Sequence, residues 1–173
     1  MSQVYFISDL HLGHKNILNF AGSLRGFASS PEEHDEVLVD RIASSVNKRD
    51  MLFILGDVAM SLEGLSLLDR IKAKQKILVR GNHDIFSEED YRKYFDNILG
   101  LAKYKGMWLS HAPIHTQELR GKLNLHGHVH GNSITDMFGG YDKRYINCCV
   151  ENCNGYPISL QSIKDGSFEG IIK

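Results

Sequence analysis

The amino-acid sequence predicts an α/β fold, on two observations. Short apolar runs that end in Gly, Asp, Asn or His recur along the chain, and a brief apolar run bounded by turn residues is typical of a buried strand. Between the early runs, apolar residues recur three and four positions apart, which is the spacing of a helix that packs one face against a sheet. This alternation predicts a parallel sheet covered by helices, followed by a more strand-rich second part.

Strands and helices alternate in the first part of the chain. The patterns predict strands over 4–7, 51–55 and 76–79, a short helix over 15–21, and longer helices over 31–46, from 61 onward and after 87. Each of the longer helices begins at a serine, which is a favoured N-cap residue. Ser30 and Glu33 form a capping box, with Pro31 at the first helical position.

The three longer helices each carry an apolar face. The residues of these faces are Leu38, Ile42 and Val46 or Ser45 in the first helix, Leu62, Leu65, Leu68 and Ile71 in the second, and Tyr91, Tyr94 and Phe95 in the third. Because residues three and four positions apart lie on the same side of a helix, each face is expected to pack inward.

The later part of the chain is predicted to be richer in strands. Apolar runs predict strands over 107–109, 123–125, 145–150 and 168–172, with a short helix over 159–164. Residues 132–142 contain Asn, Ser, Asp and two Gly and are predicted to form a loop. No internal repeat or linker interrupts the chain, so we expect a single domain spanning residues 1–173.

Composition argues against several classes of protein. The formal net charge of −1 disfavours a dedicated nucleic-acid or anionic-membrane surface. No apolar run approaches the roughly 20 residues that span a bilayer, and Val4–Ile7 does not resemble a secretory signal. Cys148, Cys149 and Cys153 form no disulfide framework or C-x-x-C pair and are expected to be small packing residues. A reduced, cytoplasmic protein is therefore expected.

Three alternating histidines, His126, His128 and His130, form the densest group of metal-capable side chains. In an extended strand all three would share a face. A turn at Gly127 and Gly131 would instead let two of them surround a small centre. Imidazole is a common ligand for divalent first-row metals. The alternative is a polar junction between a strand and a surface loop.

The same arrangement recurs upstream, because metal-capable side chains follow several predicted strands. These residues are Asp9 and His11, Asp57, Asn82, His111, and His128 with His130. Parallel strands bring their C-terminal ends to one edge of a sheet, where α/β proteins usually place ligand sites. We therefore expect these side chains to converge on one site.

Five short blocks, D-x-H, G-D, G-N-H-D, H and G-H-x-H, stand in this order at Asp9–His11, Gly56–Asp57, Gly81–Asp84, His111 and Gly127–His130. In content and order these blocks resemble those of the calcineurin-like metallophosphoesterase superfamily. The stretches 9–17 and 156–160 look like a small, uncapped bacterial or phage branch. The resemblance implies a four-layer α/β/β/α sandwich with its active site at the C-terminal ends of the strands.

The resemblance also implies a dinuclear metal centre. Asp9, His11 and His130 would bind one metal, Asn82, His111 and His128 would bind the other, and Asp57 would bridge the two. Metals about 3.5–4 Å apart need a shared anionic ligand to offset their repulsion. The mixed oxygen and nitrogen donors favour two divalent transition-metal ions, with Mn²⁺ first and Fe, Zn²⁺, Ni²⁺ or Co²⁺ as alternatives.

Two further residues of the G-N-H-D block are assigned catalytic roles by the resemblance. His83 would face the leaving oxygen and donate a proton or stabilise the transition state. Asp84 would orient the His83 ring and raise its imidazolium fraction. The alternative for Asp84 is that it only caps the following turn.

The remaining histidines have weaker assignments. His14 and His115 lie next to ligand blocks and are candidates for substrate contact. His126 is expected to flank the site or face solvent. His34 falls in a predicted helix and is expected to lie on the surface.

The function implied is hydrolysis of a phosphate ester by a metal-bridging hydroxide. A phosphodiester is favoured over a monoester, because the chain has no segment long enough for a cap domain over the site. Candidate substrates include a nucleotide or cyclic nucleotide. The alternatives are a phosphomonoesterase with the same site and a non-catalytic protein-binding scaffold, which is the role of the retromer subunit of the same superfamily. A nucleic-acid-binding module without chemistry would need a basic patch that the sequence lacks.

Overall fold

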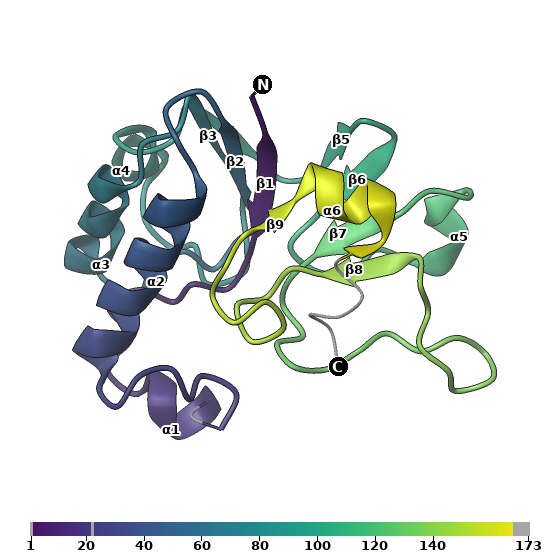
Figure 1. Ribbon diagram of the computed structural model, residues 1–173, viewed down its shortest axis with the longest axis horizontal. Helices are drawn as coiled ribbons and strands as arrows, with labels where there is room; N and C mark the ends of the chain where they lie inside the picture. The colour runs from purple at the N-terminus through teal and green to yellow at the C-terminus, as the bar shows by residue number, and fades with distance from the viewer. Residues whose placement is uncertain (1, 22, 168–173) are drawn as a thin grey trace.

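Two β-sheets stack face to face in the computed structural model, which describes residues 2–21 and 23–167 (Figure 1). The first sheet has the order β4-β3-β2-β1-β9 and consists of β1 (Val4–Ile7), β2 (Met51–Ile54), β3 (Gln75–Val79), β4 (Asn97–Leu99) and β9 (Ile158–Ser159). Strands β1 to β4 run parallel, and β9 lies antiparallel beside β1.

The second sheet has the order β5-β6-β7-β8. Its strands are β5 (Ala102–Tyr104), β6 (Met107–Leu109), β7 (Asn124–His126) and β8 (Tyr145–Asn147). Strands β6, β7 and β8 are parallel, and β5 is antiparallel to β6. Just beyond β1 and β8, Ser8 and Cys149 form a parallel bridge that connects the two sheets. The carboxyl ends of both parallel sets therefore meet at one edge.

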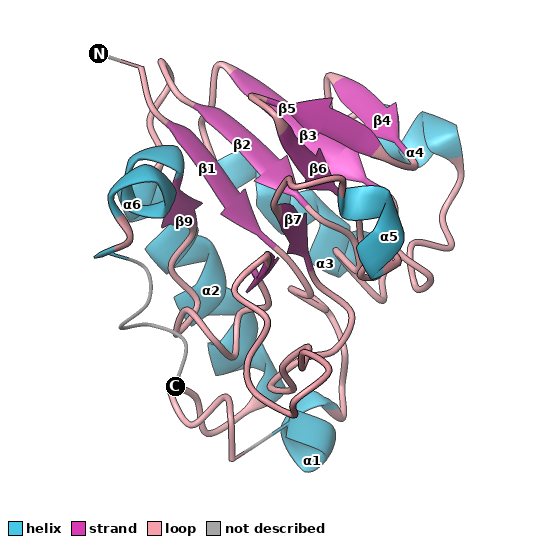
Figure 2. Ribbon diagram, turned by 90° about the vertical axis from the view of Figure 1, so that its right-hand side faces the viewer, coloured by secondary structure: helices cyan, strands magenta, loops and turns pink. Residues whose placement is uncertain are grey.

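Helices complete the outer layers. On the outer side of the first sheet lie α2 (Pro31–Ser45), α3 (Leu62–Ser66), the 3₁₀ helix η1 (Leu67–Arg70) and α4 (Glu88–Arg92) (Figures 1 and 2). The second sheet carries α5 (Thr116–Leu119), and α6 (Leu160–Asp165) packs on β1 and β9. Helix α1 (Ile17–Ala21) stands apart at the lower end of the molecule in Figure 1. The predicted α/β/β/α sandwich is confirmed.

Aromatic side chains fill the space between the sheets. Phe6 and Phe53 are register partners on β1 and β2, and their ring centroids lie 5.4 Å apart. Tyr104 of β5 reaches across, with its ring 5.0 Å from that of Phe53. Because side chains alternate along a strand, the opposite face of β1 and β2 is available to pack against the helices. Burial of such a side chain stabilises the fold by about 1.5–3 kcal/mol.

The predicted N-caps are confirmed. Ser30 Oγ accepts a hydrogen bond from Glu33 N at 3.1 Å, and Ser87 Oγ accepts one from Asp90 N at 3.1 Å. The Glu33 carboxylate, however, accepts from the backbone amide of Ser29 rather than that of Ser30. No helix within residues 2–21 and 23–167 is long and apolar enough to cross a membrane.

Several local predictions were wrong. The helix predicted from Ser61 divides into α3 and η1. Leu65, Leu68 and Ile71 of its predicted apolar face are buried, but Leu62, the first residue of α3, is half exposed. His34, predicted to lie on the surface, is fully buried. Strands β4, β5 and β9 and helix α5 were not predicted, since each is short and none is a continuous apolar run. The strand predicted over 145–150 ends at Asn147, and the one predicted over 168–172 lies outside the described residues.

Candidate metal centre

Loops that follow five parallel strands meet at the edge where the two sheets join. They follow β1, β2 and β3 of the first sheet and β6 and β7 of the second. Together they carry all seven of the predicted ligand residues, Asp9, His11, Asp57, Asn82, His111, His128 and His130. The contacts described next link these seven side chains into one cluster.

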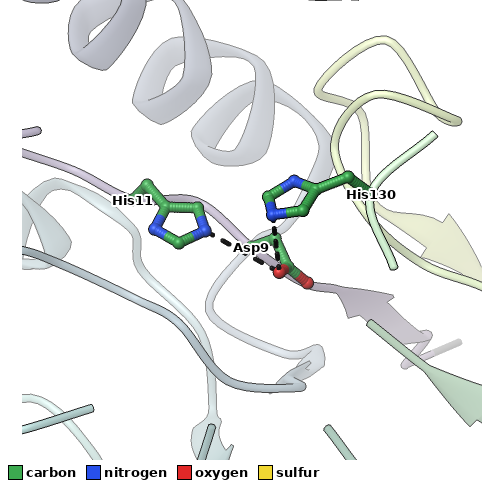
Figure 3. Close-up of side chains that lie close together, drawn as sticks. All are labelled: Asp9, His11 and His130. Carbon is green, nitrogen blue, oxygen red and sulfur yellow. Dashed lines mark ion pairs between the residues drawn. The ribbon is translucent and has the colours of Figure 1, made fainter. Parts of the chain in front are cut away.

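Asp9 lies at the centre of the first part of the cluster. Its Oδ2 is fixed by the Ser8 hydroxyl at 2.6 Å and by the backbone amide of His128 at 2.9 Å. Its Oδ1 faces Nε2 of His11 at 3.7 Å and Nε2 of His130 at 3.8 Å. Figure 3 shows the two imidazoles pointing toward this carboxylate from different loops. One oxygen is therefore used for positioning, and the other is directed at two ring nitrogens.

The two carboxylate oxygens of Asp57 also make different contacts, as those of Asp9 do. Its Oδ1 accepts a hydrogen bond from the backbone amide of His83 at 2.9 Å. Its Oδ2 lies 3.3 Å from Nε2 of His111 and 3.8 Å from Nε2 of His11. A single oxygen of Asp57 thus faces histidines from two different parts of the cluster.

The second part of the cluster consists of Asn82, His111 and His128. Asn82 Oδ1 lies 2.9 Å from both Nε2 of His111 and Nδ1 of His128. The backbone carbonyl of Leu55 accepts from Nδ1 of His111 at 2.8 Å, which leaves Nε2 of the neutral ring as the atom with a free lone pair. An amide oxygen and two imidazole nitrogens therefore meet at one point.

The buried polar atoms of this cluster fit a bound cation. Among the described residues, Asp9 Oδ1 and both ring nitrogens of His11 are buried without a hydrogen-bond partner. Leaving such an atom unpaired costs about 1–3 kcal/mol. Burial alone raises the pKa of the Asp9 and Asp57 carboxyls, but hydrogen bonds from neighbouring groups lower it more, and the net shift is downward for both. Two ionised carboxylates facing imidazole nitrogens are a suitable donor set for divalent transition metals.

The backbone at the cluster is unusual. Left-handed φ angles occur at five non-glycine residues of the cluster: Asp9 (59°), His11 (51°), Asp57 (53°), His128 (71°) and His130 (51°). This conformation is uncommon for residues other than glycine, and strain of this kind costs of order 1–3 kcal/mol per residue. The concentration of this strained backbone conformation at the cluster is typical of a functional site.

Two glycines of the sequence blocks allow the loops to approach each other. A Cβ atom on Gly81 would lie 2.2 Å from Asp57 Oδ1, and one on Gly127 would lie 2.2 Å from Asp9 Oδ2. Both contacts are shorter than any that a real side chain tolerates. The glycine before Asn82 and the glycine before His128 are therefore required by the carboxylates of neighbouring loops.

Comparison with known proteins identifies the family of this chain. Residues 2–164 match the calcineurin-like phosphoesterase family. The chain belongs to this family. Its resemblance to the small members is also confirmed, since it is 32% identical over 170 residues to the uncharacterised protein MJ1445 of Methanocaldococcus jannaschii, a match that covers 94% of this chain and 90% of that protein.

Two more relatives extend the comparison. The gene 66 protein of Mycobacterium phage L5 is 31% identical, over 78% of this chain and 80% of its own. The crystal structure of AQ665 from Aquifex aeolicus, described as a protein of unknown function, matches with a TM-score of 0.75 and 30% identity, over 95% of this chain and 99% of that one. Membership in the calcineurin-like phosphoesterase family makes this protein a metal-dependent hydrolase of phosphate esters and implies divalent metal ions.

Sequence reasoning missed Glu151, which contacts one of the candidate ligands in this phosphoesterase. Glu151 follows β8, and its Oε1 lies 2.9 Å from Nδ1 of His130. A carboxylate that accepts from Nδ1 fixes the ring orientation and would leave Nε2 available to a metal ion. Burial alone raises the pKa of Glu151, but His130 and Arg25 lower it, so the carboxyl stays ionised. Glu151 directly follows the predicted strand 145–150, and a polar residue in that position is a local signal that could have identified it.

Arg25 was also missed, and it connects Glu151 to the backbone beneath Asp9. Its side chain is fully buried, and its guanidinium donates to Glu151 Oε1 at 2.6 and 2.8 Å. The same group donates to the carbonyl oxygen of Asp9 at 2.7 Å and lies 2.8 Å from Nε2 of His34. These contacts explain the burial of His34. No local pattern marks Arg25, because its partner Glu151 is distant in the sequence.

His83 and Asp84 lie in different environments, although they are neighbours in the sequence. His83 is exposed, and its ring centroid lies 5.8 Å from that of His11. The Asp84 carboxylate accepts from the backbone amides of Gly81, Val58 and Asp57 at 2.7, 2.9 and 3.0 Å. These bonds favour the turn-capping alternative for Asp84, which would stabilise the loops carrying Asn82 and Asp57.

The remaining histidines occupy three environments. His14 is half buried, with its ring 6.2 Å from that of His11. His115 is exposed and caps α5, where its Nδ1 accepts from Gln117 N. His126 is buried rather than facing solvent, and burial lowers its pKa to about 4. It therefore flanks the cluster, which was one of its two expected positions.

The cysteines are buried with free thiols, as expected for packing residues. One of them also contacts the cluster, because Cys149 Sγ lies 3.2 Å from Asp9 Oδ2. Burial raises the pKa of this thiol well above its usual value, so it donates as a neutral group. Cys149 thus helps to fix the same oxygen that Ser8 and the His128 amide hold.

Proposed function

We propose that this phosphoesterase hydrolyses phosphodiesters at a dinuclear metal centre, with His83 assisting the departure of the leaving group. One observation carries the proposal. The Oδ2 atom of Asp57 lies within 4 Å of a histidine from each part of the cluster, 3.3 Å from His111 and 3.8 Å from His11. This placement supports the proposal, because a carboxylate here would be able to bridge two cations, which in dinuclear sites lie about 3.5–4 Å apart.

The donors divide into two groups around Asp57. The first ligand group is Asp9, His11 and His130, whose ligand atoms lie within 4.8 Å of one another. The second ligand group is Asn82, His111 and His128, whose ligand atoms meet at Asn82 Oδ1. Nitrogen donors in both groups favour Mn²⁺, Fe, Zn²⁺, Ni²⁺ or Co²⁺ over Mg²⁺ or Ca²⁺.

When bound, the metal ions supply a hydroxide nucleophile near neutral pH and offset the charge on the phosphate. The protein residues fix the geometry around them. His83 is exposed beside His11 and shares a cavity with His11 and His130, so its imidazole can donate a proton to the departing oxygen. Asp84 acts on the reaction indirectly, through the backbone of the loops that carry Asn82 and Asp57.

A diester is the preferred substrate class. The cavity at the cluster is lined by the strand-end loops and by the segment around α1, and among the described residues these elements form no cap domain over it. A phosphodiester has substituents on two sides and needs an open site. Among the described residues that line the cavity, the ionisable side chains are four histidines, so they offer no fixed cation for the second negative charge of a monoester.

The test is turnover of bis(p-nitrophenyl) phosphate and of p-nitrophenyl phosphate by metal-stripped protein that is resupplied with Mn²⁺, Zn²⁺, Ni²⁺ or Mg²⁺ in turn. We expect activity to return at about two equivalents of a transition metal, with the diester turned over faster. Faster turnover of the monoester would make the protein a phosphatase. Failure to bind any metal would contradict the proposal and favour a scaffold role.

A further inference from the structure

A cavity of about 700 Å³ extends from the candidate metal centre to helix α1. His11, His83 and His130 line one end of it. The other end is an apolar wall, which we define as Ile17, Phe20, Ala21 and Leu24. Groups bound at the cluster therefore continue directly into an apolar surface.

Two of the four wall residues, Phe20 and Leu24, are exposed, whereas Ile17 and Ala21 are buried beneath them in the hydrophobic core. Phe20 is 80% exposed and Leu24 is 50% exposed. Isolated exposed apolar residues are common, but these two line the same concave surface as the candidate catalytic histidine. An exposed aromatic ring beside a reactive centre is typical of a ligand pocket.

Contacts on both sides fix the wall in place. The Phe20 ring packs edge to face with the His14 ring, at a centroid distance of 5.8 Å. A Cβ atom on Gly131 would lie 2.7 Å from a methyl of Leu24, so Leu24 closely approaches the turn after His130. The residue that follows, Arg25, is anchored by its buried guanidinium to the backbone of Asp9. The wall is thus tied to the two loops that carry the first ligand group.

The side chains that line the cavity favour some substituents on the substrate's phosphate over others. Its described residues include no Lys, Arg, Asp or Glu, and its ionisable groups are His11, His14, His83 and His130. A substrate with additional phosphate groups would therefore meet no Lys or Arg side chain among these described lining residues. A flat, uncharged group can stack on the open ring of Phe20 and displace water from Leu24.

We propose that the apolar wall binds the organic group of the substrate, and that the preferred ester carries a planar, uncharged ring system of nucleobase size. The inference rests on the proposed function for the reaction and concerns which ester is bound. Phe20 is the residue that determines this preference.

The test compares ligands that differ only in the planar group. Binding of adenosine 5′-monophosphate and of ribose 5-phosphate to the Mn²⁺-loaded protein is measured by calorimetry, since the two share the same sugar phosphate. We expect adenosine 5′-monophosphate to bind about tenfold more tightly, in line with the stacking of one base on an aromatic ring. Phe20→Ala should abolish the difference, and Phe20→Trp should restore it.

Phe138→Ala is the matched control. Phe138 is 89% exposed and lines a separate cavity that contains none of the seven ligand residues. The Phe138→Ala protein should retain the wild-type preference for adenosine 5′-monophosphate. In turnover of bis(p-nitrophenyl) phosphate, Phe20→Ala should raise KM with kcat changed less than about twofold, because the ring contributes binding rather than chemistry.

The outcomes separate the two proposals. Equal binding of the two ligands by the wild-type protein, or an unchanged preference in Phe20→Ala, would overturn the role of the wall even if diesters are hydrolysed. Tight, Phe20-dependent binding of adenosine 5′-monophosphate without hydrolysis of any diester would support the wall and overturn the proposed function.

Discussion

The two ligand groups of the candidate centre are supported in different ways. In the first group, Asp9 and His11 are buried, and His130 is oriented by the Arg25–Glu151 ion pair. In the second group, His111 is buried and held by the Leu55 carbonyl. Asn82 and His128, however, are exposed, and the side-chain contacts described for them are with each other and with His111. A site whose ligands are already oriented binds its ion with less loss of conformational entropy. We therefore expect the first group to hold its ion more tightly than the second.

Asp57 is the residue on which both groups depend, and its loss should have the largest effect. Asp57→Asn removes the negative charge that would lie between the two cations, so repulsion between them is no longer offset. Activity should fall to background, and the metal content after dialysis should fall below two ions per chain. Retention of two ions with normal turnover would remove Asp57 from the bridging position.

His83 belongs to neither group, so its replacement should separate chemistry from metal binding. His83→Ala should lower kcat by about 10²- to 10⁴-fold, the usual contribution of a general acid or base. Its metal content should equal that of the wild-type protein. His115→Ala is a suitable control, because His115 is exposed and its ring contacts the N-terminus of α5. Normal turnover of His83→Ala would refute the catalytic role.

Glu151→Gln tests the difference between the groups directly. The amide keeps a hydrogen-bond acceptor near His130 but removes the charge, and loss of such a partner typically lowers metal affinity about 10- to 100-fold. Calorimetric titration should show one of two binding steps weakened and the other retained. Glu36→Gln, which alters an exposed ion pair with Arg70, should change neither step. Equal weakening of both steps would show that the groups are not independently supported.

The smallest predicted effect is the contribution of His34 to the pH dependence of the protein's stability. His34 contacts Arg25, which supports the first ligand group through Glu151. Burial lowers the pKa of His34, and Arg25 is its nearest cation. The folded protein therefore binds this proton less readily than the unfolded chain, so stability is lost as the pH falls below about 6.5. The slope contributed by one group is at most about 1.4 kcal/mol per pH unit.

Denaturant unfolding of wild-type protein and His34→Gln, in the same metal state, measures this slope between pH 7.5 and 5.5. His34→Gln should flatten the dependence, since glutamine does not titrate. An identical slope in both proteins would show that His34 does not contribute to it.

Much of the fold and of the candidate site could be predicted from local patterns. The strands that precede Asp9, Asp57 and Asn82 are short apolar runs, and the helix starts at Ser30 and Ser87 have the expected caps. The short strands β4, β5 and β9 could not be predicted in this way. Each of these segments has only two or three residues and mixes polar with apolar side chains, unlike the apolar run of β6, so hydrogen bonds to neighbouring strands define them.

By itself, the sequence identified the candidate donor residues and predicted the sheet edge at which they meet. That information is local, because each block is a few residues long and follows a recognisable strand. Only the tertiary structure decided which groups surround the donors. Arg25 and Glu151 lie 126 residues apart in the chain, Asp84 bonds to the backbone of another loop, and Phe20 lies at the cavity because α1 stands beside the His130 turn. Such contacts form between chain segments that are distant in sequence, so no spacing rule reveals them before the two sheets are packed together.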